Sequence, residues 1–312
     1  MNNYILTVTL NPAVDKTVRV RKLLPEKEGR FSGGRLSAGG KGINVSRALK
    51  ELGIPTLATG FCGGPSGKLI RAALDREKIP HDFIAISGET RTNVTIRETS
   101  TGRLRRVLQK GPSVTRQELE KFRRSFRPLA RRAAAVVFSG RNVGGAGEGF
   151  YAELIRLARR LGKKTALDTS GRPLAAGLKA KPYLVKPNRA EAEFVMGKKL
   201  RTPRALRKAL EYFGKQGISV VLISLGREGA VASNGREFWR VVPPRVKAVN
   251  TVGCGDALVA GFLYAESRGL SFCETLRTAV AVGTTNALSL TPGHLRRSDI
   301  ARISRGIKIK AL

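Results

Sequence analysis

The acidic residue Asp256 lies in the stretch NTVGCGDALVAGFL, Asn250 to Leu263, where small residues lead directly into an apolar helical pattern. Gly253 and Gly255 leave backbone N–H groups free to face an anion, and a helix start adds the positive end of its dipole. A carboxylate beside such an anion site can take the proton of a substrate hydroxyl as that hydroxyl attacks a phosphoryl group. The alternative is that Asp256 serves only as a helix cap.

A glycine cluster opens a second helical pattern in SAGGKGINVSRALKELG, Ser37 to Gly53. Glycines at this place allow the backbone to approach a small ligand closely. A tight turn before an amphipathic helix explains the same residues equally well. The spacing matches neither a Walker A loop nor a GxGxxG fingerprint.

Two further stretches end predicted strands. In LVKPNRAEAE, the strand ends in Lys186 and Asn188, and Glu191 follows in the next turn, which is the spacing of a capping box. In LISLGREGA, the residues Ser224, Gly226 and Gly229 follow a buried strand and are typical of a hairpin turn. Each stretch has an adequate structural explanation when it is taken alone.

Short β-like runs alternate with longer helical patterns along the whole chain, beginning with YILTVTL and the helix GINVSRALKELG. Strands separated by helices predict right-handed βαβ units and a mainly parallel sheet, an α/β sandwich. Ligands bind such sheets beyond the carboxyl ends of the strands, and the four stretches above are expected at that edge.

Two segments depart from this alternation. Residues 12–36 and 91–110 alternate polar and apolar side chains without a helical period, and STG at 100–102 is a favourable hairpin turn. They predict antiparallel strands in a small sheet outside the main one. Such a sheet would serve as a lid or as a dimer contact.

The composition excludes several classes of protein. The 312 residues are 41% hydrophobic, enough for one large α/β domain, and no apolar run is long enough to span a membrane. The N-terminus lacks the features of a signal peptide, so a cytoplasmic location is expected. Three cysteines without CxxC spacing and two distant histidines argue against a disulfide framework, a zinc site and a Ser-His-Asp triad.

The net charge of +35, from 58 Lys and Arg against 23 Asp and Glu, predicts attraction to anions, including sugar phosphates and nucleic acids. The basic runs, such as RRSFRPLARR from Arg123 to Arg132, have helical spacing between apolar residues and indicate solvated helix faces. Aromatic residues do not interleave with them. Nucleic-acid binding is therefore expected only as incidental polyanion affinity.

The order and spacing of the four stretches resemble the ribokinase / phosphofructokinase B family of carbohydrate kinases. AGGKGINVSRALKELG is similar to the N-terminal signature of that family and NTVGCGDALVAGF to its C-terminal signature, with KPN..E and S.G..GA between them. The resemblance implies one ribokinase-like domain over residues 1–312, a three-layer α/β/α sandwich with a mainly parallel sheet. It also implies a small β-sheet lid from about 12–36 and 91–110, and a homodimer formed through the lid sheets.

Three other motifs, TVTLNPAVDKT, GETRTNVTI at 88–96 and LDTSG at 167–171, are similar to the branch that phosphorylates phosphorylated ketohexoses. The resemblance implies an ATP-dependent kinase that requires Mg²⁺ and acts on fructose 6-phosphate. The alternatives are a 1-phosphofructokinase or a tagatose-6-phosphate kinase. From another class, a basic nucleic-acid-binding protein on a non-catalytic kinase scaffold would bind duplex DNA at high salt without ATP turnover.

The resemblance also implies roles for individual residues. Asp256 would be the catalytic base, and Gly253, Cys254 and Gly255 would form the anion hole. The residues expected to bind the sugar or its phosphate are Asp15, Lys27, Gly40, Lys41, Asn44, Arg91, Arg106 and Ser139. Those expected to bind the nucleotide are Lys186, Asn188, Glu191, Ser224, Gly226 and Gly229, with Glu191 also reaching Mg²⁺ through water.

Two positions depart from the family pattern. The sugar-binding loop, usually SGSLP, is SGRNVGG here, from Ser139 to Gly145. Arg141 would either add a contact to the phosphate or disturb the binding of the sugar, so the change bears on the substrate more than on the reaction. Cys254 stands where the family usually has Ala or Ser. Because the backbone N–H of this residue would do the work, activity is expected to survive the change.

Overall fold

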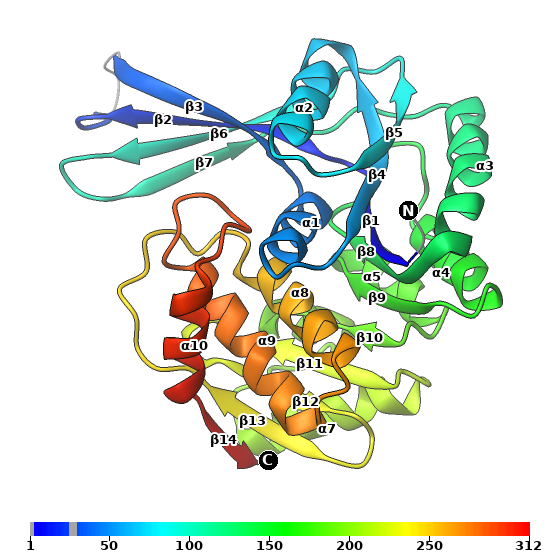
Figure 1. The fold of residues 1–312 in the computed structure, drawn as a ribbon, viewed down its shortest axis with the longest axis vertical. Coiled ribbons are helices and arrows are strands. Elements are labelled where there is room, and N and C mark those ends of the chain that lie inside the picture. Colours follow the sequence, from blue (N-terminus) through cyan, green and yellow to red (C-terminus); the bar gives the residue numbers. More distant parts are fainter. Residues whose placement is uncertain (1–2, 25–29) are drawn as a thin grey trace.

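The computed structural model describes residues 3–24 and 30–312, and within them ten strands form one sheet in the order β14-β13-β12-β11-β10-β9-β8-β1-β4-β5 (Figure 1). The strands from β11 to β5 are parallel, and β12 to β14 add an antiparallel edge. Their bounds are β1 (Tyr4–Thr9), β4 (Thr56–Gly63), β5 (His81–Ile86), β8 (Ala133–Ser139), β9 (Lys164–Asp168), β10 (Leu184–Val185), β11 (Val220–Ser224), β12 (Ala230–Ser233), β13 (Phe238–Val242) and β14 (Lys308–Ala311).

Helices cover both faces of this sheet, because its inner strands are apolar on both sides. Leu6 and Val8 of β1 belong to one core and Ile5 to the other. The first core packs against α3 (Arg116–Arg132), α4 (Phe150–Arg160), α5 (Gly171–Leu178), α6 (Arg189–Met196) and α7 (Pro203–Lys215). The second packs against α1 (Lys41–Glu51), α8 (Cys254–Ser267), α9 (Phe272–Asn286) and α10 (Arg297–Arg305). The predicted three-layer α/β/α sandwich is confirmed.

A second sheet projects from the sandwich as the predicted lid (Figure 1). It consists of β2 (Ala13–Val20), β3 (Phe31–Gly39), β6 (Arg91–Glu98) and β7 (Leu104–Leu108), in the order β3-β2-β6-β7. Helix α2 (Gly64–Arg76) packs against its base, where Val14 and Ala38 share a core cluster with Ile70 and Leu74. The hairpin predicted at residues 100–102 joins β6 to β7.

The lid is not wholly antiparallel, and that part of the prediction was wrong. Strands β2 and β6 pair in parallel, with Asp15 opposite Asn93, while the β2–β3 and β6–β7 pairs are antiparallel. The reason is topological, because the chain returns through β3, α1, β4, α2 and β5 before β6 leaves the core in the same direction as β2. No helix among the described residues has the length and apolar character needed to cross a membrane.

Candidate active site

Helix α8 begins at the glycine pair singled out in the sequence, and backbone conformation and limited space account for the first of them. Gly253 is the N-cap residue, with φ of 82° in the left-handed region, and a Cβ there would lie 2.7 Å from Cβ of Pro292. A Cβ on Gly255 would lie 3.2 Å from Nζ of Lys186. The helix start therefore lies beside a buried cation, an arrangement suited to binding an anion. Of the predicted anion-hole groups, the backbone N–H of Cys254 donates to the carbonyl of Thr251 at 3.4 Å.

Asp256 lies in the first turn of α8 and is 4% exposed. Its Oδ2 accepts a hydrogen bond of 2.8 Å from Nδ2 of Asn44, which belongs to α1. A carboxylate that served only as a cap would accept its hydrogen bond from a first-turn amide. The contact with Asn44 instead joins two helices and favours a chemical role for Asp256.

Two lysines and a second aspartate complete the centre of the site. Asp168 ends β9 and is 1% exposed, and its Oδ1 lies 2.8 Å from Nζ of Lys41 and 3.3 Å from Nζ of Lys186. Its Oδ2 is buried without a hydrogen-bond partner in the described structure. Asp168 therefore fixes the positions of two cations and still has one free acceptor oxygen.

The electrostatics of the two aspartates differ. Burial and the nearby charge of Asp168 raise the pKa of Asp256 to about 6, while Lys41, Asn44 and Lys186 act in the opposite direction. Burial also opposes ionisation of Asp168, but Lys186 and Lys41 hold its pKa below the ordinary value. The pKa of Lys41 is raised, because Asp168, Asp256 and Glu191 outweigh the effect of burial. At neutral pH, Asp256 is therefore an ionised base that can take up a proton.

The lid contributes Asp15, which faces the start of α1. A Cβ on Gly39 would lie 2.1 Å from Oδ2 of Asp15, so only glycine lets the carboxylate lie against this backbone. Nδ2 of Asn93 donates a 2.8 Å hydrogen bond to Oδ1 of Asp15. Gly40, the N-cap residue of α1, has φ of 128°, and a Cβ there would lie 2.7 Å from Cγ2 of Thr9. The predicted glycine cluster is thus a place of close backbone approach.

The two predicted phosphate-binding arginines lie around Asp15. Arg91 begins β6, and its Nη2 donates a 2.9 Å hydrogen bond to the carbonyl of Asn11. Arg106 is exposed on β7, opposite Thr95, and its charge acts on Asp15. Burial raises the pKa of Asp15, and the Asn93 hydrogen bond and these arginines oppose that effect. Lys27, the third predicted phosphate ligand, lies outside the described residues.

The loop after β8 begins beside Asp168 and Lys41. Ser139 is fully buried, and its Oγ has no hydrogen-bond partner in the described structure. The backbone N–H of Gly140 donates to the carbonyl of Asp168 at 2.9 Å. Arg141 is exposed, and its charge lowers the pKa of Arg91 together with burial, which has the larger effect. Arg141 therefore lies near Arg91, one of the two predicted phosphate-binding arginines.

The predicted nucleotide residues meet at the end of β10. Oδ1 of Asn188 accepts from the N–H of Glu191 at 2.9 Å, and Oε2 of Glu191 accepts from the N–H of Asn188 at 2.8 Å, forming the expected capping box of α6. Oε1 of Glu191 lies 3.9 Å from Nζ of Lys41. The capping interpretation is thus confirmed. The distance from Oε1 also places Glu191 beside the ammonium group of Lys41.

The LISLG turn joins this group through backbone contacts. Ser224 pairs with Asn188 in a parallel bridge, and its N–H donates to the carbonyl of Pro187 at 3.0 Å. Gly226 and Gly229 both have positive φ, and a Cβ on Gly229 would lie 2.0 Å from the carbonyl oxygen of Val241. The β11–β12 hairpin predicted here is present.

Sequence reasoning did not identify Asp168 as a site residue, although it lies in the LDTSG motif. Its signal is an aspartate that directly follows the apolar pair Ala166 and Leu167 at the end of a short strand, in a chain with few acids. Arg47 of α1 was also missed, because an arginine in an amphipathic helix is normally expected on the exposed face. Within residues 3–24 and 30–312, no three His, Cys, Asp or Glu side chains cluster as a metal site.

Comparison with known proteins places this geometry among kinases. Residues 8–294 match the family model described as pfkB family carbohydrate kinase. Tagatose-6-phosphate kinase from Staphylococcus epidermidis is 34% identical over 308 residues, which cover 98% of this chain and 99% of that relative.

Solved structures agree over almost the full length. Phosphofructokinase-2 from Escherichia coli in complex with fructose-6-phosphate superimposes with a TM-score of 0.90 and 28% identity, covering 98% of this chain and 99% of that chain. A possible 1-phosphofructokinase from Thermotoga maritima gives a TM-score of 0.87 at 28% identity, covering 99% of this chain and 100% of that chain.

Proposed function

Because this chain belongs to the pfkB family of carbohydrate kinases, we propose that it transfers the γ-phosphoryl group of ATP to fructose 6-phosphate. It is a sugar-phosphate kinase of the pfkB type, and sugar kinases of this family use ATP. The observation that carries the proposal is the buried Asp256, bound to Asn44 beside the Lys41–Asp168–Lys186 cluster.

Asp256 acts as the base in the proposed mechanism. It takes the proton of the attacking hydroxyl, and Asn44 holds its carboxylate in place. The backbone N–H groups from Gly253 to Gly255 and the ammonium of Lys186 face the phosphoryl oxygens, on which charge is spread in the transition state. Closure of the lid over the sugar excludes water as a competing acceptor.

The sugar phosphate binds between the lid and the start of α1. Asp15, Gly40, Lys41 and Ser139 hold the hydroxyl groups, supported by the close contact of Asp15 with Gly39. Arg91 and Arg106 bind the phosphate, since a guanidinium donates two parallel hydrogen bonds to phosphate oxygens. Arg141 adds a further cation near Arg91 and strengthens the preference for a phosphorylated substrate.

The nucleotide binds along the ends of β10 and β11. Lys186 and the Asn188–Glu191 capping box meet the phosphates, and Ser224, Gly226 and Gly229 line the rest of the nucleotide site. The free Oδ2 of Asp168 and the carboxylate of Glu191 suit Mg²⁺, which prefers one or two carboxylates together with substrate phosphates and waters. When bound, Mg²⁺ neutralises charge on the phosphate oxygens.

We propose a homodimer formed through the lid sheets. Leu36 and Val107 lie in one register row across the lid and are 52% and 62% exposed. Phe31, at the start of the same edge strand β3 as Leu36, is 54% exposed. Large apolar side chains gathered on one sheet face are typical of a surface that another protein covers.

A second candidate substrate is tagatose 6-phosphate, which the 34% identity with a tagatose-6-phosphate kinase favours. An ADP-release assay with ATP and Mg²⁺ compares fructose 6-phosphate, tagatose 6-phosphate, fructose 1-phosphate and fructose. We expect the highest kcat/KM for fructose 6-phosphate and little turnover of unphosphorylated fructose. If another phosphorylated sugar gives a higher kcat/KM, that sugar is the substrate instead of fructose 6-phosphate. If none of the four sugars is turned over, the proposed function is contradicted.

A further inference from the structure

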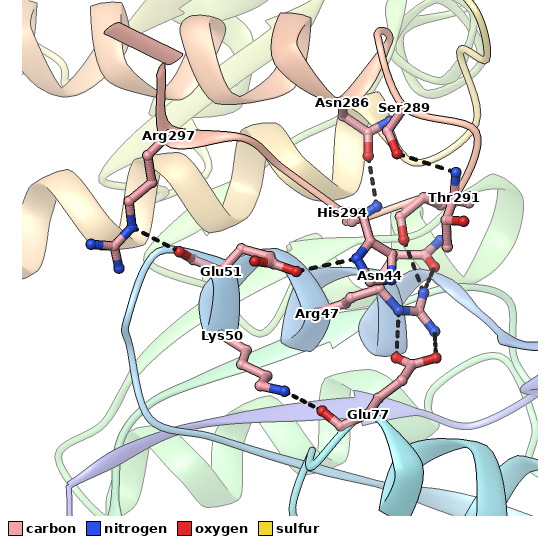
Figure 2. Close-up of polar contacts among 12 residues, drawn as sticks. Asn44, Arg47, Lys50, Glu51, Glu77, Asn286, Ser289, Thr291, His294 and Arg297 are labelled. Atoms are coloured by element: carbon pink, nitrogen blue, oxygen red, sulfur yellow. Dashed lines mark hydrogen bonds and ion pairs between the residues drawn. The ribbon is translucent and has the colours of Figure 1, made fainter. Parts of the chain in front are cut away.

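Arg47 of α1 lies next to Asn44, and all five N–H donors of its guanidinium are bound. Figure 2 shows its contacts with Asn44 and Glu77. The side chain is 2% exposed. Nε and Nη2 hold both carboxylate oxygens of Glu77 at 2.6 and 3.0 Å. The remaining donors bind Oδ1 of Asn44 at 3.1 Å, the carbonyl of Pro292 at 2.9 Å and the carbonyl of Ala38 at 3.0 Å.

The first consequence is that Arg47 fixes the orientation of the Asn44 amide. Nη1 of Arg47 donates a hydrogen bond to Oδ1 of Asn44, so Nδ2 of the same amide faces Asp256. If the amide turned over, its oxygen would face the carboxylate, acceptor against acceptor, and its NH₂ would face the guanidinium, donor against donor. Arg47 thus acts on Asp256 through Asn44.

The second consequence concerns the loop that supports the start of α8. Pro292, held by Nη1 of Arg47, is the residue whose Cβ limits the space at Gly253. The next residue, Gly293, has φ of 84°, and a Cβ there would lie 2.8 Å from Cβ of Arg47. The N–H of Gly293 donates to Oδ1 of Asn286 at 2.7 Å, and Asn286 in turn donates to the carbonyl of Val252. Arg47 therefore also holds the loop beneath the anion site.

The third contact reaches the lid. Ala38 is the penultimate residue of β3, and its carbonyl accepts from Nη2 of Arg47. The guanidinium of Arg47 therefore binds three separate parts of the site: Ala38 at the base of the lid, Asn44 beside Asp256, and Pro292 in the loop next to Gly253. Glu77 holds that guanidinium from the far side, just beyond the end of α2.

We propose that Arg47 is a positioning residue for phosphoryl transfer, which keeps Asn44 turned toward Asp256 while it fastens the lid and the anion-site loop at one point. This inference rests on the proposed role of Asp256 as the base. A purely structural arginine would affect stability alone, whereas a positioning residue also affects kcat and the pH dependence of the reaction.

The test compares Arg47→Met and Glu77→Gln with the matched control Arg123→Met. Arg123 also binds a glutamate through two nitrogens, with Nε and Nη2 at 2.6 and 2.9 Å from the Glu153 carboxylate, but it joins α3 to α4 away from the site. For each variant, kcat, KM and the acid limb of kcat/KM are measured on protein whose folded fraction is known from chemical denaturation.

We expect Arg47→Met to lower kcat by roughly 10- to 100-fold, because a small displacement of a catalytic group is costly. The acid limb should move to higher pH, since the Asn44 hydrogen bond lowers the pKa of Asp256. The other groups that face Asp256, namely Asp168, Lys41 and Lys186, are unchanged in these variants. Glu77→Gln should lower kcat and shift the acid limb of kcat/KM in the same direction, but by less. Arg123→Met should leave both kcat and the acid limb of kcat/KM as in the wild type.

Wild-type kcat and an unmoved acid limb in folded Arg47→Met would overturn the inference and leave the proposed function intact. If Arg47→Met does not fold, Glu77→Gln decides in the same way, because Glu77 is only partly buried. Absence of sugar-kinase turnover in the wild-type protein contradicts the proposed function itself and, with it, the premise of the inference.

Discussion

Asp256 and Asp168 share one buried cluster, yet their surroundings give them different chemistry. Two ammonium groups enclose Asp168 and keep it ionised. Burial and the charge of Asp168 raise the pKa of Asp256, and the hydrogen bond from Asn44 only partly opposes them. Paired carboxylates whose pKa values are pushed apart by their environments are typical of acid–base sites. Cys254 stands beside them, and burial raises the pKa of its thiol, so that the protonated thiol is not a nucleophile.

We expect Asp256→Asn to lower kcat by about 100-fold or more while the protein remains folded, because loss of a general base has this magnitude. The amide is nearly isosteric with the carboxylate and can still bind Asn44. Steady-state kinetics measure the loss, and circular dichroism and thermal unfolding check the fold. Turnover near the wild-type rate would remove Asp256 from the role of base.

The pH dependence follows from the raised pKa of Asp256. As the proposed base, Asp256 must be ionised, so kcat/KM should be constant well above pH 6 and fall as the pH drops through about 6. The phosphate of the substrate also ionises near this pH, so the fall in kcat/KM must be assigned to one of these two groups. Asp256→Glu makes the assignment, because the pH at which kcat/KM falls changes in that variant only if residue 256 is the group that titrates.

At the scale of the elements, helix starts carry both structure and chemistry. Helix α3 begins with a capping box formed by Thr115 and Glu118, and α6 begins with the same device formed by Asn188 and Glu191. Both boxes satisfy backbone N–H groups that would otherwise lack partners. Of the two glutamates, Glu191 lies near Lys41, whereas Glu118 binds Ser87. Variants of the two capping boxes can therefore be compared to distinguish the stabilising effect of a helix cap from a contact with the nucleotide.

Thr115→Ala and Asn188→Ala should each lower the free energy of unfolding by about 1 kcal/mol, the usual cost of a lost cap. Only Asn188→Ala should also raise the KM for ATP, because only this residue is proposed to meet the nucleotide. Urea denaturation and steady-state kinetics measure the two effects separately. An unchanged KM for ATP in Asn188→Ala would reduce this residue to a cap.

At the scale of the whole molecule, the sandwich holds the chemistry and the lid extends from it with an apolar surface. Part of the strong positive charge lies on exposed helix faces: in α3, Lys121, Arg124 and Arg127 are exposed while Phe122 and Phe126 are buried. This distribution confirms the predicted solvated faces. The field it creates attracts phosphorylated sugars, nucleotides and other anions without selecting among them.

We expect Val107→Glu to weaken the proposed lid dimer, because it replaces an exposed apolar side chain, in the same register row as Leu36, with a charged one. Phe194→Glu is the matched control, since Phe194 is similarly exposed, at 59%, but lies on α6. Sedimentation velocity should show a dimer for the wild type and the control, and a larger monomer fraction for Val107→Glu. A monomeric wild type, or an unaffected variant, would contradict association through the lid.

The sequence by itself determined the features that depend on near neighbours. The alternation of apolar strands and amphipathic helices determined the three layers, since an element with an apolar face must bury it. The Asn188–Glu191 box and the turn at 100–102 were predictable because their contacts span only a few residues. The glycines at α1 and α8 were visible through residue type and spacing.

Only the tertiary structure decided which distant residues meet. The Asn44–Asp256 bond joins positions 212 apart in the chain, and the Lys41–Asp168 pair joins positions 127 apart. Helical periodicity predicts an exposed Arg47, but α2, the lid strand β3 and the loop at Pro292 enclose it. The parallel β2–β6 pair was missed for a similar reason. Strand direction depends on the path of the intervening chain, and burial depends on what packs from elsewhere, and neither is encoded in local spacing.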